Sequence, residues 1–512
     1  METRRGQLAL LLVATLAVAV ILIATQPRDV FWGSDSGNRF IQLQSFLRTG
    51  GLAIEHRWPI GHHFLDVNGK TYSYYSPIFS ILAALLYPAG LFVLPIAGTL
   101  LLMALIPRLT RAPILPLGLI LIFGTPILWY TIVFWEHTLA AAIALAAFVL
   151  VERDRAFIAG LLAGASTLLR EEGYMVIAAI AIAMLLTRRA GVPPAVFIAG
   201  GLIPLLPLWV FNAMIFGHPL GLHAEVYSSI ARGNKLSNFF PFLFEFSSIR
   251  PANVLCVLPV IALIAISPFR VDGRVRAALF ALTAIGFAVL TTLFLHSRAP
   301  IHETLYLQGL FPAVPFTAAM FLDIRRERFR VVTVVAGIIL TTLTLNQADF
   351  GVIWGPRHFL WLLPLMIVLA ADALGEWSGS PVIVAGAIVL LICSFTIQFR
   401  GIELLRSKLR FSKSLLEAVR RDPSTMVLTD VFWIPEDLAA AFYEKDFGVV
   451  RNDRELSGAL QTIGPRPFLF IAARQFRLVS NAGMGPLMSG VKKRQRIAGI
   501  DPMLDVMLLG VE

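Results

Sequence analysis

The chain has 512 residues, of which 57% are hydrophobic and only 15% are charged. Soluble domains carry about 25% charged residues, so this composition excludes an ordinary soluble protein and predicts a polytopic membrane protein. The formal net charge is +11. Much of the basic excess lies in short loops beside apolar runs, where it orients membrane helices and meets anionic lipids, so we expect no nucleic-acid partner.

A helix that crosses the hydrocarbon core needs about 20 apolar residues. About thirteen runs approach this requirement and predict an all-α polytopic protein. They lie near residues 7–25, 77–108, 113–130, 134–151, 156–169, 174–187, 194–216, 252–268, 277–295, 304–322, 331–346, 358–374 and 381–398. The second run is interrupted by Pro88, Gly90 and Pro95, which predicts a kinked helix or a helix followed by a re-entrant segment.

Basic residues between the runs predict the orientation. With the N-terminus in the cytoplasm, alternation places five basic pairs or clusters in inner loops: Arg108 and Arg111; Arg153 and Arg155; Arg188 and Arg189; Arg270, Arg274 and Arg276; and Arg325, Arg326, Arg328 and Arg330. All nine histidines then fall on the outer side. We expect a multi-pass protein of the plasma (inner) membrane with an extracytoplasmic C-terminus.

Two domains are predicted. Residues 1–400 form the membrane module, which includes a long first outer loop at 26–76. Residues 401–512 combine apolar stretches such as TMVLTDVFWI with helical patterns such as ELLRSKLRFSKSLLEAVRR, which indicates a small extracytoplasmic α/β domain. The two cysteines, Cys256 and Cys393, lie inside apolar runs and provide no disulfide framework.

The first outer loop contains Asp35 within GSDSGNRFIQ. A carboxylate at the rim of a membrane can act as a general base toward an incoming acceptor. The alternative is that Asp35 caps the helix that follows, because Asp favours that position.

A second outer turn, FWEHTLA, places Glu136 next to His137. An acid and an imidazole at the start of a helix can bind a divalent metal ion or orient a reacting group. Adjacent residues do not share one helix face, so anchoring at the interface is the alternative.

The turn LLREEGY contains Arg170, Glu171 and Glu172. The planar guanidinium of Arg170 can hold a phosphate in a bidentate manner, and Glu171 is a further candidate for substrate binding. A local salt bridge with Glu171 or Glu172 is the stronger alternative for Arg170.

Other outer segments supply weaker candidates. The loop GHPLGLHAEVY offers His218, His223 and Glu225 for substrate contact, and HSRAPIHETLY offers His296, His302 and Glu303 for metal binding or proton transfer. A solvated loop explains the first group almost as well.

The segment WGPRHFLWLLP is the most specific feature near the C-terminal end of the membrane module. Pro356 can begin a helix, which would place Arg357 and His358 in its first turn beside unpaired amides that attract an anion. Trp354 suits stacking on a sugar ring. An interfacial belt of Trp and Arg is the alternative to this phosphate site.

Together these motifs resemble those of the GT-C membrane glycosyltransferases, which include protein O-mannosyltransferases, aminoarabinose transferases of lipid A and oligosaccharyltransferases. The segments that carry the resemblance are GSDSGNRFIQ, YSPIFSILAALLYPAG, FWEHTLA, LLREEGY, NAMIFGHPLG and WGPRHFLWLLP, spread over most of residues 1–400.

The resemblance implies a polyprenyl-phosphate-sugar donor in contact with membrane lipids, an extracytoplasmic acceptor (glycan, lipid or protein), and inversion at the anomeric carbon. It maps the general base to Asp35. We predict that Arg357, helped by Arg170, binds the donor phosphate. Tyr74 is a further candidate for substrate binding. Two departures from the family pattern, Ser36 after the loop aspartate and Glu136 and His137 in the second outer turn, leave the need for a divalent metal open.

Two other classes of protein remain open. A transporter or flippase for lipid-linked glycans could use the same outer residues as a binding vestibule, although neither an inverted repeat nor a clearly broken helix at the midplane is evident. A membrane scaffold would not explain why polar groups recur at the outer ends of so many helices.

Overall fold

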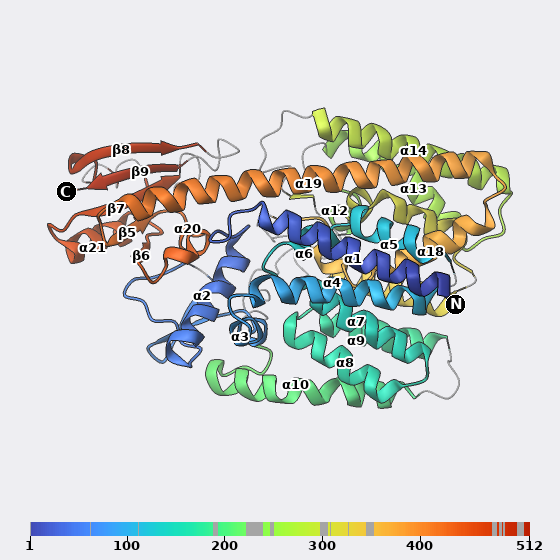
Figure 1. The fold of residues 1–512 in the computed structure, drawn as a ribbon, viewed down its shortest axis with the longest axis horizontal. Coiled ribbons are helices and arrows are strands. Elements are labelled where there is room, and N and C mark those ends of the chain that lie inside the picture. Colours follow the sequence, from blue (N-terminus) through green and yellow to red (C-terminus); the bar gives the residue numbers. More distant parts are fainter. Residues whose placement is uncertain are drawn as a thin grey trace. The chain divides into compact units, whose positions relative to one another are not determined.

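The computed structural model describes residues 2–511 apart from 62, 111, 188–192, 222–238, 246–249, 297–305, 308, 326, 345–352, 474–478, 481–483, 485–486 and 499–505. The described chain is mostly helical (Figure 1). It forms two compact units. Unit 1 comprises residues 1–22, 92–299 and 303–402, and unit 2 comprises residues 23–91, 300–302 and 403–512.

Unit 1 is built from apolar helices. Its elements are α1 (Glu2–Ala24), α4 (Gly90–Leu109), α5 (Ile114–Phe123), α6 (Ile127–Thr131), α7 (His137–Glu152), α8 (Ala156–Leu169), α9 (Gly173–Leu186), α10 (Pro194–Phe216), α12 (Phe239–Phe244), α13 (Arg250–Ile266), α14 (Gly273–His296), α16 (Leu310–Ala313), the 3-10 helices η2 (Pro315–Leu322) and η3 (Arg357–Phe359), α17 (Arg328–Thr344), α18 (Leu363–Glu376) and the first part of α19 (Pro381–Arg421). Strands β3 (Tyr306–Leu307) and β4 (Ile353–Trp354) pair in parallel.

Five helices within the described ranges are long and apolar enough to cross a bilayer: Arg4–Ala24 of α1, α4, α10, α14 and α19. The chain is accordingly a multi-pass membrane protein. Helices α5, α7, α8, α9 and most of α13 are apolar but shorter, so the expected number of about thirteen spans is not confirmed.

Several predicted runs differ in detail from the helices observed. Region 77–108 forms two helices, α3 (Ile78–Leu85) and α4, with Pro88 between them. The run at 304–322 was expected to be one α-helix, but it contains β3, the single turn α16 and the 3-10 helix η2. Pro312 and Pro315 lie within that run, and proline lacks the amide that a continuous helix would use.

Helices α7, α8, α9 and α10 pack beside one another (Figure 1). Glycines make the α8–α10 contact close: a Cβ at Gly160 would collide with the backbone carbonyl of Phe197, and one at Gly200 with that of Phe157. Small residues allow this backbone approach, which is the usual way that membrane helices gain packing energy.

Unit 2 contains the first loop and the tail. Its elements are α2 (Ser34–Thr49), the antiparallel hairpin β1 (Phe64–Val67) and β2 (Lys70–Ser73), α3, the end of α19, α20 (Ile434–Asp437), η4 (Ala439–Ala441), α21 (Asp453–Ile463), and strands β5 (Met426–Thr429), β6 (Asp446–Val449), β7 (Phe468–Ala473), β8 (Val491–Ile497) and β9 (Val506–Val511).

The five strands of the tail form one mixed sheet in the order β6-β5-β7-β9-β8. Strand β5 is parallel to β6 and β7, whereas β9 is antiparallel to β7 and β8. A core that includes Leu428, Phe470 and Leu509 packs with Leu456 of α21. Asn452 begins α21 by accepting a hydrogen bond from the Glu455 amide.

Helix α19 continues well past the predicted end of its span at residue 398 (Figure 1). Its last part is amphipathic, because Leu405, Leu409 and Leu416 are buried while Arg410 and Arg421 face solvent. The helical pattern predicted after residue 400 is therefore joined to the last apolar run without a break.

Candidate functional site

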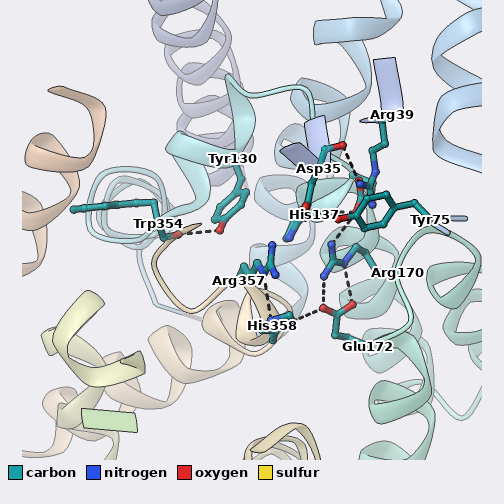
Figure 2. Close-up of polar contacts among 11 residues, drawn as sticks. Asp35, Arg39, Tyr75, Tyr130, His137, Arg170, Glu172, Trp354, Arg357 and His358 are labelled. Carbon is teal, nitrogen blue, oxygen red and sulfur yellow. Dashed lines mark hydrogen bonds and ion pairs between the residues drawn. The ribbon is translucent and has the colours of Figure 1, made fainter. Parts of the chain in front are cut away.

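Asp35 lies in the first turn of α2, in unit 2, and is partly exposed. The hydroxyl of Tyr75 donates a hydrogen bond to Oδ1 of Asp35 (Figure 2). Arg39, one turn later, lies 4.3 Å from the centre of the Tyr75 ring and donates from Nη1 to the backbone oxygen of Asp35 at 3.3 Å. Burial and the charge of Asp35 raise the pKa of Tyr75 well above its ordinary value, so Tyr75 stays a donor. Asp35 does not cap α2, because Gly33 is the N-cap residue and no side chain caps the helix. The Asp35 carboxylate instead accepts a hydrogen bond from Tyr75.

Buried polar side chains fix α2 against the residues that precede α3. Gln42 donates to the backbone oxygen of Tyr75 at 3.1 Å, and Ser73 donates to Oδ1 of Asn38 at 2.5 Å. Asn38 in turn donates to the backbone oxygen of His63 at 3.5 Å. Asn38 and Gln42 are each no more than 3% exposed. This arrangement holds Tyr75 beside Asp35.

Unit 1 contains a pocket formed by the start of α7, the turn between α8 and α9, and the segment from Arg357 to Trp361. Its polar lining comprises His137, Ser166, Arg170, Glu172, Arg357 and His358. The cavity measures about 30 Å³, which has room for one or two water-sized groups. It can receive the polar end of an anion without holding a whole sugar.

Arg170 and Glu172, which both line this pocket, form an ion pair (Figure 2). Nε of Arg170 donates to Oε2 of Glu172 at 2.9 Å, Nη2 donates to Oε1, and Nη1 donates to Glu136 at 3.0 Å. Burial alone would raise the pKa of Glu172, but the Arg170 charge and the hydrogen bonds from Arg170 and His358 hold it well below its ordinary value. Of the alternatives for Arg170, the structure shows the salt bridge, and its partners are Glu172 and Glu136.

His358 links Glu172 to Arg357. Nδ1 of His358 contacts Oε1 of Glu172, and Nε2 lies 3.3 Å from Nε of Arg357. Because Nε of Arg357 can only donate, Nε2 of His358 accepts and Nδ1 donates to the carboxylate. The Arg357 guanidinium also lies 5.7 Å from the centre of the Trp135 ring. The predicted pair Arg357 and His358 thus meets the predicted Arg170 in one pocket.

The α-helix expected to begin at Pro356 is not formed there. Pro356 precedes only the three-residue helix η3, and the α-helix α18 begins at Leu363. Arg357 and His358 therefore do not lie in the first turn of an α-helix, and helix amides do not support an anion site there. Pro364 lies in the first turn of α18, where its missing amide is tolerated, whereas a continuous helix from Pro356 would place it in the helix interior and lose a hydrogen bond.

Trp354 is fully buried, which does not fit the expected stacking on a sugar ring. Its Nε1 donates to Gln398 at 3.1 Å, and its backbone oxygen accepts a hydrogen bond from Tyr130 at 2.9 Å. The contact with Gly401 leaves no space beside the indole. In the structure Trp354 packs the core of unit 1.

Glu136 and His137 are both buried at the start of α7. The His137 ring stacks on Tyr130 at 4.7 Å, and its Nδ1 lies 3.9 Å from Oε1 of Glu136, the same oxygen that accepts from Arg170. Within the described part of the chain, no group of three or more His, Cys, Asp or Glu side chains is placed to hold a metal ion. A metal at this pair stays a prediction.

The other candidates are dispersed. Glu171 lies in the α8–α9 turn, and Nδ1 of His218 accepts from the Leu220 amide at 3.2 Å in the turn after α10. Tyr74 donates to the hydroxyl of Tyr75 at 3.2 Å. His296 ends α14, where its Nδ1 lies 2.9 Å from the backbone oxygen of Thr292. The candidates His223, Glu225, His302 and Glu303 lie outside the described residues.

Three contacts were absent from the sequence interpretation. They are Tyr75 with Asp35, Glu172 with His358, and His63 with Glu436, whose Nδ1 and Oε1 atoms lie 2.5 Å apart. Glu172 was considered only as a partner for Arg170. Tyr75 could have been considered as a partner for Asp35, because it is adjacent to the candidate Tyr74. Nothing in the sequence pairs His63 with a residue of the tail.

No family model and no curated protein matches the chain. Among solved structures, ArnT from Cupriavidus metallidurans is similar in two states, bound to undecaprenyl phosphate and apo. Sequence identities are 13% and 12%, TM-scores are 0.42 and 0.41, and 97% of each chain is covered in both comparisons. A likeness this distant assigns no equivalent residues.

Proposed function

We propose that the chain is a membrane glycosyltransferase that moves a sugar from a polyprenyl-phosphate donor to an extracytoplasmic acceptor with inversion. The observation that carries the proposal is the unit 1 pocket, in which Arg170 and His358 contact the carboxylate of Glu172 and Arg357 contacts His358. Guanidinium groups suit phosphate recognition because their planar donors match its oxygens. The apolar helices of the same unit suit the lipid tail of such a donor.

In the proposed reaction the acceptor hydroxyl oxygen attacks the anomeric carbon while the bond from that carbon to the phosphate oxygen breaks. The hydroxyl proton passes to the Asp35 carboxylate, and the polyprenyl phosphate leaves with the bonding electron pair. Arg357, helped by Arg170, stabilises the negative charge on the departing phosphate. The hydrogen bond from Tyr75 orients the base.

The test uses purified protein in lipid vesicles with defined polyprenyl-phosphate sugars and a panel of extracytoplasmic acceptors. We expect cleaved donor and glycosylated product. Asp35→Asn should abolish transfer without changing the amount of folded protein, and Arg357→Ala should mainly raise the KM for the donor. Full transfer by Asp35→Asn would overturn the assignment of the base. Movement of intact donor across the bilayer without cleavage would instead support a flippase.

A further inference from the structure

The His63–Glu436 pair lies within unit 2 and joins the first loop to the tail. Glu436 is fully buried and His63 is 7% exposed, and Nδ1 of His63 lies 2.5 Å from Oε1 of Glu436. The two residues are separated by 373 positions in the chain. Burying an ionised acid costs free energy unless the acid is paired or neutral, so the contact with His63 helps to stabilise Glu436 inside unit 2.

Glu436 faces the helix that bears Asp35. Its backbone carbonyl packs directly on Gly37, where a Cβ would collide with it. Burial, followed by the nearby charges of Asp35 and Asp437, raises the pKa of Glu436 well above its ordinary value, and this favours its neutral form. Glu436 therefore interacts electrostatically with Asp35.

His63 is connected to Tyr75 by ring packing and by hydrogen bonds. Its ring centre lies 5.2 Å from that of Tyr74 and 5.9 Å from that of Tyr75. Its backbone oxygen accepts from Asn38, which also accepts from Ser73. A change in the orientation of His63 would therefore reach the tyrosine that donates to Asp35.

The neighbouring acid fixes the other side of α20. Oδ2 of Asp437 accepts from Lys408 of α19, and Lys408 also donates to Ser412 at 2.8 Å. Lys408 and Asp437 are both 1% exposed. Breaking a buried ion pair is strongly destabilising, so α20 is held to α19 through Asp437 while Glu436 faces His63.

We propose that Glu436 is a positioning residue for Asp35 and acts through His63 and Tyr75. The inference rests on the proposed role of Asp35 as the general base. In this proposal the C-terminal tail positions the general base, and this role does not require the tail to bind the acceptor.

The experiment compares Glu436→Gln, Glu436→Ala, His63→Ala, the double alanine variant and Glu417→Ala, an acid on the exposed side of α19. Thermal unfolding and gel filtration select the folded variants. Hydrogen exchange of residues 34–49 then reports on α2 without any need for activity. In Glu436→Ala and His63→Ala we expect faster exchange by at least about tenfold. Exchange in Glu436→Gln should match wild type, because an amide reproduces the shape and hydrogen bonding of a neutral acid.

Kinetics separate positioning from general stability. We expect kcat to fall by about 10- to 100-fold in either alanine variant, because small misplacements of catalytic groups slow the reaction by such factors. The donor KM should stay within about twofold of wild type. Glu436→Gln should restore kcat, and the double variant should be no slower than the slower single variant. Glu417→Ala should match wild type throughout.

Unchanged exchange at residues 34–49 in a folded alanine variant would overturn the inference. Additive losses in the double variant, or a Glu436→Gln enzyme as slow as Glu436→Ala, would also overturn it. If wild-type protein transfers no sugar, the proposed function fails, whereas the exchange result still decides whether Glu436 positions α2. If Glu436→Ala does not fold, His63→Ala provides the same test.

Discussion

At the residue scale, the contact between Tyr75 and Asp35 gives the carboxylate a fixed donor. Tyr75→Phe removes that donor and leaves the ring in place. A hydrogen bond to a charged group contributes about 1.5–3 kcal/mol, so we expect kcat to fall by about tenfold or more. Steady-state kinetics should show little change in the donor KM. Tyr87→Phe, at a tyrosine that is 43% exposed, is the matched control, and equal losses in both variants would contradict the prediction.

Glu172 occupies the hydrogen bonds that a donor phosphate would need. It accepts from Arg170 and His358, so the phosphate must compete with it. Glu172→Gln lowers the negative charge of the pocket, and we expect polyprenyl phosphate to bind more tightly, with a Kd lower by about 3- to 10-fold. Calorimetry in detergent measures the change, with Glu171→Gln as the control. Weaker binding by Glu172→Gln would instead show that the carboxylate is needed to hold the side chains of Arg170 and His358 in place.

The pKa of Glu436 predicts a pH dependence of stability. A glutamate in the unfolded chain titrates near about pH 4.3, whereas burial and the charge of Asp35 raise the pKa in the folded protein. Above the unfolded value, the folded state keeps a proton that the unfolded state has lost, so stability falls as the pH rises toward the folded pKa. Below the unfolded pKa, Glu436 is protonated in both states, so it no longer makes the stability depend on pH. Glu436→Gln lacks this titration, although His63, Asp35 and Asp437 still face the position.

The Tm of Glu436→Gln should therefore exceed that of wild type by an amount that grows as the pH rises above about 4.3, the pKa of an unfolded glutamate. Thermal unfolding in detergent at several pH values provides the measurement. A difference that is constant with pH, or that shrinks as the pH rises, would contradict the raised pKa.

At the element scale, α2 depends on its close contact with α20. Gly37→Ala places a methyl group against the Glu436 carbonyl, and overpacking of this kind costs about 1–3 kcal/mol. Gly458→Ala is the matched control, because Gly458 lies inside α21 and a methyl group there would meet nothing within 4 Å. We expect Gly37→Ala to lower the Tm and Gly458→Ala to raise it slightly, since alanine favours a helix. A Gly37→Ala protein as stable as Gly458→Ala would contradict the contact.

Regular elements could be predicted from sequence more fully than irregular ones. The bounds of α8 and α10 agree with the runs at 156–169 and 194–216, because each run is apolar and is flanked by charged or helix-ending residues. The segment 304–322 was mispredicted because hydropathy does not distinguish a buried 3-10 helix from an α-helix. The start of α18 is mispredicted because both Pro356 and Pro364 can begin a helix, and the α-helix begins beside the second of them.

The candidate site was only partly predictable for a related reason. Arg170, Arg357 and His358 were each identified from local motifs, and the structure brings them to one pocket. Their partners depend on contacts between distant segments: Glu172 meets His358 across 186 positions. The buried state of Trp354 was also invisible, because a tryptophan beside Gly and Pro has the same local sequence whether it packs or binds.

At the scale of the whole molecule, the proposed function requires one orientation in the membrane. Single cysteines at positions 35 and 357, in a background without Cys256 and Cys393, should react with an impermeant thiol reagent from the same outer side. Positions 153 and 274, in predicted inner loops, should react only after the membrane is permeabilised. The positive-inside distribution is the physical reason for this expectation. Labelling of 35 and 357 from opposite sides would exclude a shared role in one transfer reaction.

The glycine contacts between α8 and α10 have a consequence for the pocket in unit 1. Arg170 directly follows the last residue of α8, and the helix is locked to its neighbour by main-chain atoms at Gly160 and Gly200 rather than by adaptable side chains. The Arg170 guanidinium therefore follows a helix whose position does not change when side-chain rotamers change. Fluctuations of the surrounding lipid should leave its position unaffected, whereas a bulkier residue at 160, about three helical turns away, would displace it together with the entire helix.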